Sequence, residues 1–100
     1  MNSYPLGNLI RVTAAFTSFT TGMPLDPDVV MLSVLDATGT LTTYTFGSGG
    51  MIVKDSIGDY HADLNGNSAG IWSYRWWSTG NGQAALEKQF QVKRAAAVAP

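Results

Sequence analysis

The only histidine of the chain, His61, stands between two acidic residues at alternating positions, Asp59 and Asp63. In an extended strand these three side chains share a face, and carboxylate and imidazole groups are metal ligands. Neighbours on such a face are about 6.5 to 7 Å apart, which is too far for all three to reach one ion without further ligands. We therefore expect His61 to be a solvated, outward-facing residue.

Other groups that could do chemistry also lack the spacing that the chemistry needs. Nucleophilic catalysis with His61 calls for a serine exposed on a strand-to-helix turn, and the run Gly47-Ser48-Gly49-Gly50 lacks that flanking pattern. The same run has neither the helix nor the Lys-Ser/Thr pair of a phosphate loop. Asp26, Asp28 and Asp55 offer oxygen ligands, but their spacing differs from the twelve-residue calcium loop. We expect a protein that is not an enzyme and that binds no metal ion or cofactor.

Large side chains on the expected surface are more informative. One alternating set near the end of the chain is aromatic and comprises Trp72, Tyr74 and Trp76. If that set fills the core, the period of two turns Trp77 outward beside Arg75, and both residue types are enriched at interface hot spots. Met31 and Leu35 add apolar area to an outer strand face. We predict these four as protein-interface residues; the alternatives are that they cover one another or lie under a loop, and that Trp77 binds sugar.

The apolar pattern has a period of two, and Gly, Pro, Asn and Asp interrupt it every 8 to 12 residues, which is typical of an all-β protein. This pattern predicts seven strands, at about 8–19, 28–36, 40–46, 51–54, 59–64, 71–79 and 83–93. Residues 84–91 also have helical propensity, but the closing alternation Phe90-Gln-Val-Lys93 favours a strand.

These strands favour an immunoglobulin-like antiparallel β-sandwich over residues 8–93, with a small closed barrel as the competing architecture. Residues 1–7 and 94–100 lack side chains able to fill a core, so we expect a loose N-terminal arm and a flexible C-terminal tail. The predicted core comprises Ile10, Val12, Phe16, Val30, Leu32, Val34, Tyr44, Tyr60, Leu64, Trp72, Trp76, Leu86, Phe90 and Val92.

Composition excludes several classes of protein. With six basic and seven acidic residues in 100, the net charge is −1, and only 13% of residues are charged against about 25% in a typical domain. Without a basic cluster we expect no nucleic-acid partner, and without a long apolar run no membrane span or export signal. Cysteine is absent, so there is no disulfide framework.

The Thr-rich first and third predicted strands lack the Lys that blocks edge pairing, which favours a homo-oligomer or a docked partner.

Several short motifs resemble small immunoglobulin-like virion structural proteins of tailed bacteriophages and prophages, over about residues 7–93. The motifs that carry this resemblance are Gly22-Met-Pro-Leu-Asp-Pro27, Asp36-Ala-Thr-Gly39, Gly58-Asp-Tyr60, Gly70-Ile-Trp72-Ser-Tyr74 and Phe90-Gln-Val92. The stretch 56–60 is also similar to a tyrosine corner, although Ala62 stands where antibody domains have Cys.

The resemblance implies a role in the virion, most naturally as a capsid decoration or cement protein present in many copies. The implied partners are the major capsid protein or other virion subunits, and the implied location is the virion. A head-tail connector or tail-associated protein is an alternative within the same family, and a host-surface carbohydrate-binding module is an alternative from another class. The resemblance supplies no catalytic residues.

Overall fold

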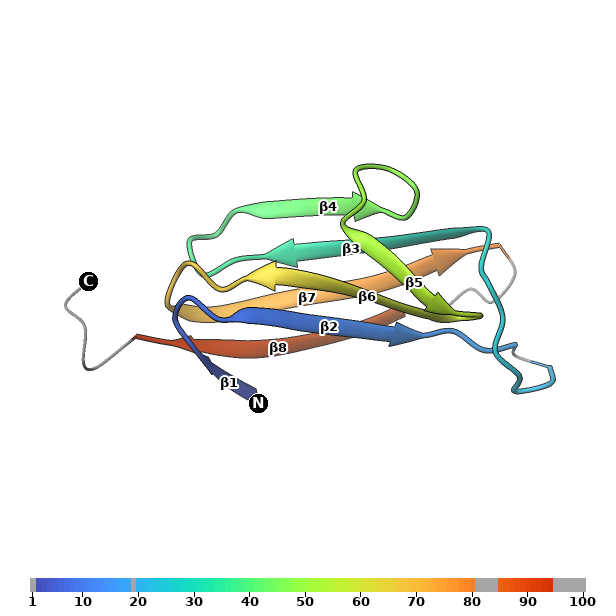
Figure 1. Cartoon of the computed structure of the whole chain (residues 1–100), viewed down its shortest axis with the longest axis horizontal. Helices are drawn as coiled ribbons and strands as arrows, with labels where there is room; N and C mark the ends of the chain where they lie inside the picture. Colours follow the sequence, from blue (N-terminus) through green and yellow to red (C-terminus); the bar gives the residue numbers. More distant parts are fainter. Residues whose placement is uncertain (1, 19, 81–84, 95–100) are drawn as a thin grey trace.

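The computed structural model of the chain describes residues 2–18, 20–80 and 85–94. These residues form strands joined by turns and loops (Figure 1). The strands are β1 (Asn2–Pro5), β2 (Leu9–Ala15), β3 (Val29–Leu35), β4 (Leu41–Thr45), β5 (Ile52–Ser56), β6 (Asp59–Asn65), β7 (Gly70–Thr79) and β8 (Ala85–Lys93). Strands β2 to β8 correspond to the seven predicted strands, and the helical alternative is wrong over the described residues 85–91.

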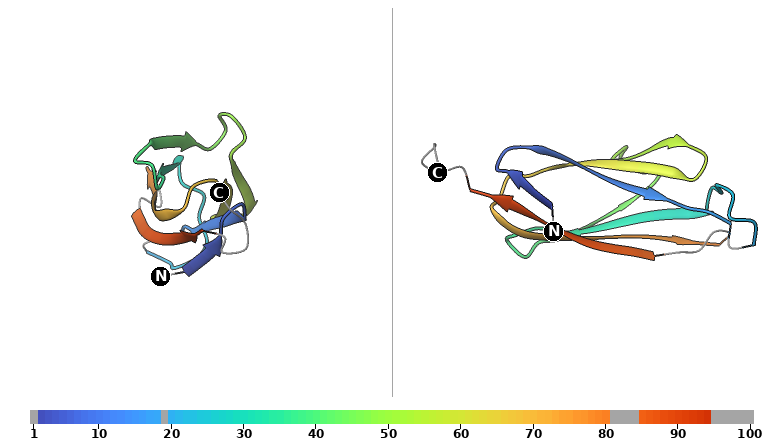
Figure 2. Two further views of the ribbon diagram at one scale, coloured as in Figure 1. Left: turned by 90° about the vertical axis from the view of Figure 1, so that its left-hand side faces the viewer. Right: turned by 90° about the horizontal axis from the view of Figure 1, so that it is seen from below.

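The strands form two sheets that pack face to face as a sandwich (Figure 2). The larger sheet has the order β1-β8-β7-β3-β4, and the smaller has the order β2-β6-β5. All pairs are antiparallel except β1 with β8, which is parallel. The prediction of a β-sandwich is therefore confirmed, and its wholly antiparallel pairing is wrong at this one edge.

Strand β1 corrects the expectation of a loose arm. Residues 2–5 pair in register with residues 90–93 of β8, and the ring of Tyr4 lies edge-on to Phe90 at 5.7 Å between centroids. The amide of Leu6 donates to the carbonyl of Lys93 in β8, and the chain then turns into β2. Of the tail predicted at 94–100, only Arg94 lies within the described residues.

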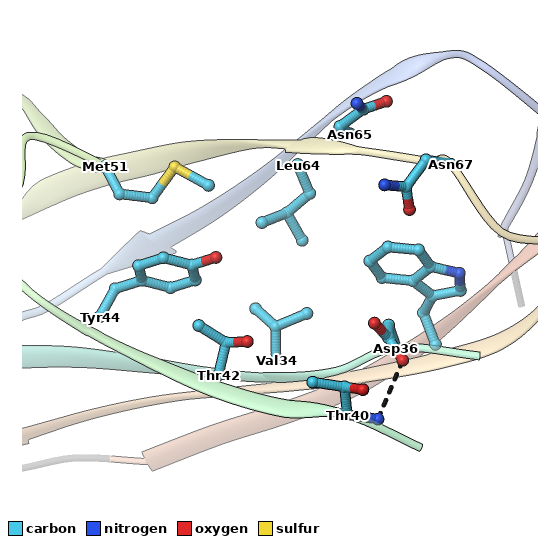
Figure 3. Close-up of a pocket in the computed structure, with 10 residues that line it drawn as sticks. Val34, Asp36, Thr40, Thr42, Tyr44, Met51, Leu64, Asn65 and Asn67 are labelled. Atoms are coloured by element: carbon cyan, nitrogen blue, oxygen red, sulfur yellow. Dashed lines mark hydrogen bonds between the residues drawn. The ribbon is translucent and has the colours of Figure 1, made fainter. Parts of the chain in front are cut away.

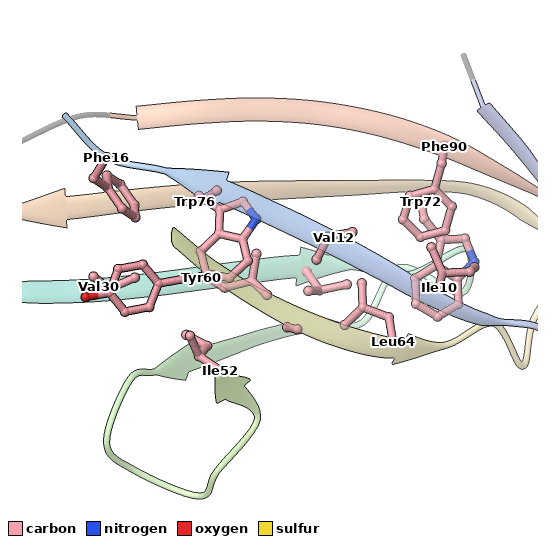
Figure 4. Close-up of a cluster of buried hydrophobic side chains, with 14 of the residues drawn as sticks. Ile10, Val12, Phe16, Val30, Ile52, Tyr60, Leu64, Trp72, Trp76 and Phe90 are labelled. Carbon is pink, nitrogen blue, oxygen red and sulfur yellow. The ribbon is translucent and has the colours of Figure 1, made fainter. Parts of the chain in front are cut away.

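Most of the predicted core is buried between the sheets (Figure 4). Two residues differ from the prediction: Tyr44 is half-buried, and Leu86 is 39% exposed because β1 covers only the second half of β8. Ala14, Ile52 and Ala62 are buried in addition to the predicted core residues. The full buried set is Ile10, Val12, Ala14, Phe16, Val30, Leu32, Val34, Ile52, Tyr60, Ala62, Leu64, Trp72, Trp76, Phe90 and Val92.

The carboxylate of Asp26 joins the long β2–β3 loop to the β5–β6 hairpin. Its Oδ1 accepts the backbone N–H of Gly58 at 2.8 Å and the hydroxyl of Tyr60 at 3.1 Å, and its Oδ2 accepts the ammonium of Lys54 at 2.5 Å. Tyr60 thus lies on β6 and donates to a side chain. A tyrosine corner would donate to the backbone a few residues upstream in the chain, so that interpretation of residues 56–60 is wrong.

Candidate interaction surface

The pairing register of the larger sheet brings the four predicted interface residues onto one outer face. Met31 lies directly opposite Trp77 across β3 and β7. Arg75 lies one step further along the same face of β7, and Leu35 one step beyond it on β3, opposite Ser73. Because pairing partners on one face are about 4.5 to 5.5 Å apart, residues that are up to 46 positions apart in the chain become neighbours.

Arg75 and Trp77 interact directly on this face. The guanidinium carbon of Arg75 lies 5.3 Å from the centre of the Trp77 ring, which is a cation–π contact. Trp77 is half-buried and faces away from the core, while Trp76 on the other side of the strand is fully buried. Trp77 points outward beside Arg75, as the period of two predicts. The guanidinium of Arg75 lies over the Trp77 ring.

A groove of about 290 Å³ runs along the same face next to Arg75. Leu35 and Leu41 are opposite one another in the β3–β4 pair and are 41% and 65% exposed. The groove is lined by Ser33, Leu35, Leu41, Ser73, Tyr74, Arg75 and Glu87. Leu41 was missed as a surface residue, although its alternation with Thr43 and Thr45 on one strand face was a usable signal.

The outer face of the smaller sheet has a different chemistry, because its charged residues pair with each other. Arg11 on β2 donates to both carboxylate oxygens of Asp63 on β6, at 2.8 and 3.1 Å. This fork of two bonds lowers the pKa of Asp63 below its usual value. The charge on this face is therefore largely satisfied within the chain.

His61 lies on that face but is not solvated as expected. Only 7% of it is exposed, and its Nδ1 lies 2.7 Å from a carboxylate oxygen of Asp55 on the adjacent β5. Its neighbours in sequence, Asp59 and Asp63, are bonded elsewhere, to Ser56 and Arg11. A His–Asp pair alone is not a catalytic or metal site, and the described residues contain no cluster of three or more metal-ligating side chains.

A second hollow, of about 210 Å³, opens between the two sheets beside β4 (Figure 3). It exists because β5 pairs only with residues 59–62 of β6, so the end of β6 has no strand neighbour on that side. Val34, Leu64 and Trp72 contribute apolar walls, and Thr42 and Tyr44 approach from β4. Asp36 at its rim is engaged by the amides of Thr38 and Thr40, so its carboxylate is part of the β3–β4 turn.

Comparison with protein-family models, with curated proteins and with solved structures finds no match for this chain. Over the described part of the chain, no helix has the length and apolar character needed to cross a membrane. The geometry of the two outer faces and of the sheet edges is thus the basis for a functional proposal.

Proposed function

We propose that the chain is an immunoglobulin-like domain. The larger sheet runs β8-β7-β3-β4 and the smaller runs β2-β6-β5, which is the arrangement G-F-C-C′ over B-E-D of a variable-type immunoglobulin sandwich when β2 is taken as strand B. The long β7 then corresponds to strand F, and its inward Trp72 and Trp76 replace the disulfide-centred core of antibody domains.

The proposed activity is protein binding, without catalysis, through the outer face of the larger sheet. A single observation carries this proposal: the two outer faces differ, because one satisfies its charges internally while the other presents Met31, Leu35, Arg75 and Trp77 around an open groove. A central Trp and Arg among apolar residues is the composition typical of an interface core.

The resemblance to phage proteins extends this to a role in the virion. We propose a capsid decoration or cement protein that docks this face on the major capsid protein and stabilises the head lattice. A connector or tail-associated position uses the same face on a different virion subunit.

The test is reconstitution on purified phage particles that lack the protein. Wild-type chain is expected to sediment with heads at a fixed ratio and to raise their thermal stability. Leu35→Ser is expected to weaken this binding, whereas Val53→Ser is the matched control, since Val53 is 43% exposed on the opposite sheet and Leu35 is 41% exposed. A wild-type chain that never associates with heads, necks or tails contradicts the proposal, and so does equal binding by both variants.

Carbohydrate binding through Trp77 has less support, because sugar rings stack on an open aromatic face and Arg75 lies over this one. The measurement that separates the two proposals is a glycan-binding assay with Trp77→Ala. Loss of glycan binding in that variant, with unchanged binding to particles, would favour the carbohydrate alternative.

A further inference from the structure

Among the described residues, the two sheets have four edge strands, and three of these strands carry a feature that discourages pairing with another chain. Strand β5 has Lys54 and a break in register between Lys54 and Ser56. Strand β1 is short and ends in Pro5, and β2 presents Arg11. Charges, prolines and irregularities are the usual means by which proteins protect sheet edges.

Strand β4 is the exception. Its sequence, Leu41-Thr-Thr-Tyr-Thr45, has no charge and no proline, and it pairs with β3 in unbroken register. The amide of Asp36 donates to the carbonyl of Thr40, and the amide of Phe46 donates to the carbonyl of Val30. The backbone N–H and C=O groups of the even-numbered residues of β4 therefore point toward β3. The amides and carbonyls of Leu41 and Thr43 must then point to the open edge, since they alternate along a strand.

We propose that β4 pairs antiparallel with β4 of a second copy about a two-fold axis at Thr42, which joins the two larger sheets into one. The turn after β4 sets this register: the carbonyl of Thr45 already accepts the amide of Ser48 at 3.1 Å, so the free part of the edge is centred on Thr42. Leu41 of each copy then exchanges both backbone bonds with Thr43 of the other.

The chemistry of β4 selects a second copy as the occupant. An uncharged strand can face itself without bringing like charges together, and Thr–Thr pairs are favourable across strands. On the inner side, Thr42 and Tyr44 of the second copy come to lie at the mouth of the inter-sheet hollow that the same residues line (Figure 3). On the outer side, the grooves beside Leu41 become neighbours on one continuous sheet.

The contact between copies is self-complementary, as a two-fold dimer requires. This inference goes beyond the proposed function and makes specific the homo-oligomer expected from the sequence, and it does not depend on binding to particles. A chain that dimerises through β4 and ignores particles contradicts the virion role alone. A monomeric chain that binds particles contradicts the β4 pairing alone.

The experiment uses charge at Thr42, whose side chain would face its own copy across the axis. Wild-type chain is expected to show a concentration-dependent monomer–dimer equilibrium in sedimentation. Thr42→Lys and Thr42→Glu are each expected to weaken dimerisation by about tenfold or more, because like charges then lie directly opposite. An equimolar mixture of the two is expected to restore a dimer that contains both variants.

Thr13→Lys and Thr13→Glu are the matched controls, because Thr13 is also an exposed threonine on an edge strand, in the other sheet. They are expected to dimerise like the wild type. A wild-type chain that is monomeric at every concentration overturns the proposal, as does a mixture of the Thr42 variants that stays monomeric.

Hydrogen exchange on the wild-type chain gives a second readout that needs no substitution. The amides of Leu41 and Thr43 are expected to become more protected as concentration rises, while those of Thr42 and Tyr44 are protected throughout by β3. Equal exchange of Leu41 and Thr43 at low and high concentration would overturn the proposed register.

Discussion

Asp26 shows how one residue can hold distant segments together. The ammonium of Lys54 and the amide of Gly58 lower the pKa of its carboxyl below the ordinary 3.8, with a further contribution from the Tyr60 hydroxyl. Burial and this carboxylate in turn raise the pKa of Tyr60 to about 12, so the phenol stays neutral and donates. The loop before β3 is therefore anchored by groups that lie 28 to 34 positions later in the chain.

Tyr60→Phe tests this anchor with little change in packing, because the ring also contacts Phe16 and Phe46 edge-on at 5.7 and 5.2 Å. Loss of the hydroxyl is expected to lower the free energy of unfolding by about 1.5 to 3 kcal/mol, the range for a hydrogen bond to a charged acceptor. Denaturant unfolding measures it. If Asp26→Asn already removes the bond, the two changes combined should be less than additive.

Gly58→Ala is expected to be more damaging than Gly39→Ala. Both glycines have positive φ, +78° and +91°, but a Cβ at Gly58 would collide with the carbonyl of Phe16, whereas one at Gly39 meets nothing nearby. The strained backbone alone costs about 1 to 2 kcal/mol in each variant, and overpacking adds about 1 to 3 kcal/mol at Gly58. Equal urea unfolding midpoints for the two variants would show that the turn at Gly58 accommodates a Cβ without additional strain.

At the scale of elements, the N-terminal segment is the clearest difference from expectation. Strand β1 extends the larger sheet in parallel, and its only large side chain packed on the core is that of Tyr4. A parallel edge strand without a connecting hairpin has no local sequence signal, since its partner lies almost 90 residues away.

Tyr4→Ala is expected to lower the free energy of unfolding by about 1 to 2 kcal/mol, because the edge contact with Phe90 and the apolar area under the ring are lost. Asn2→Ala is the control on the same strand, since Asn2 is exposed. Thermal or denaturant unfolding compares the two. Identical stability of both variants would indicate that β1 behaves as a free arm in solution.

At the scale of the whole molecule, stability should fall at both ends of the pH range. The pKa values of Asp26, Asp36 and Asp63 are lower in the folded chain than the ordinary 3.8 because hydrogen bonds stabilise their ionised forms. Their contribution is present above about pH 4 and is lost as pH falls through the lowered folded values.

Tyr60 gives the opposite limit. Its pKa rises from 10.0 to about 12 on folding, so its contribution is present below pH 10 and is lost between pH 10 and about 12. Unfolding midpoints measured across pH check both limits. The alkaline loss is expected to be smaller in Tyr60→Phe and the acid loss smaller in Asp26→Asn; a variant with the wild-type pH profile would contradict the assigned residue.

The sequence by itself determined the all-β class, the strands β2 to β8, most of the core and the outward direction of Met31, Leu35, Arg75 and Trp77. These follow from alternation along a single strand, which is a local property. Tertiary structure decided the pairing of β1 with β8, the bond between Asp26 and Tyr60, and the partner of His61, because each joins segments whose spacing in the chain carries no information about contact. It also decided which strands are edges: alternation along one strand does not distinguish an edge strand from a central one, and the register and neighbours of β4 leave its uncharged edge open.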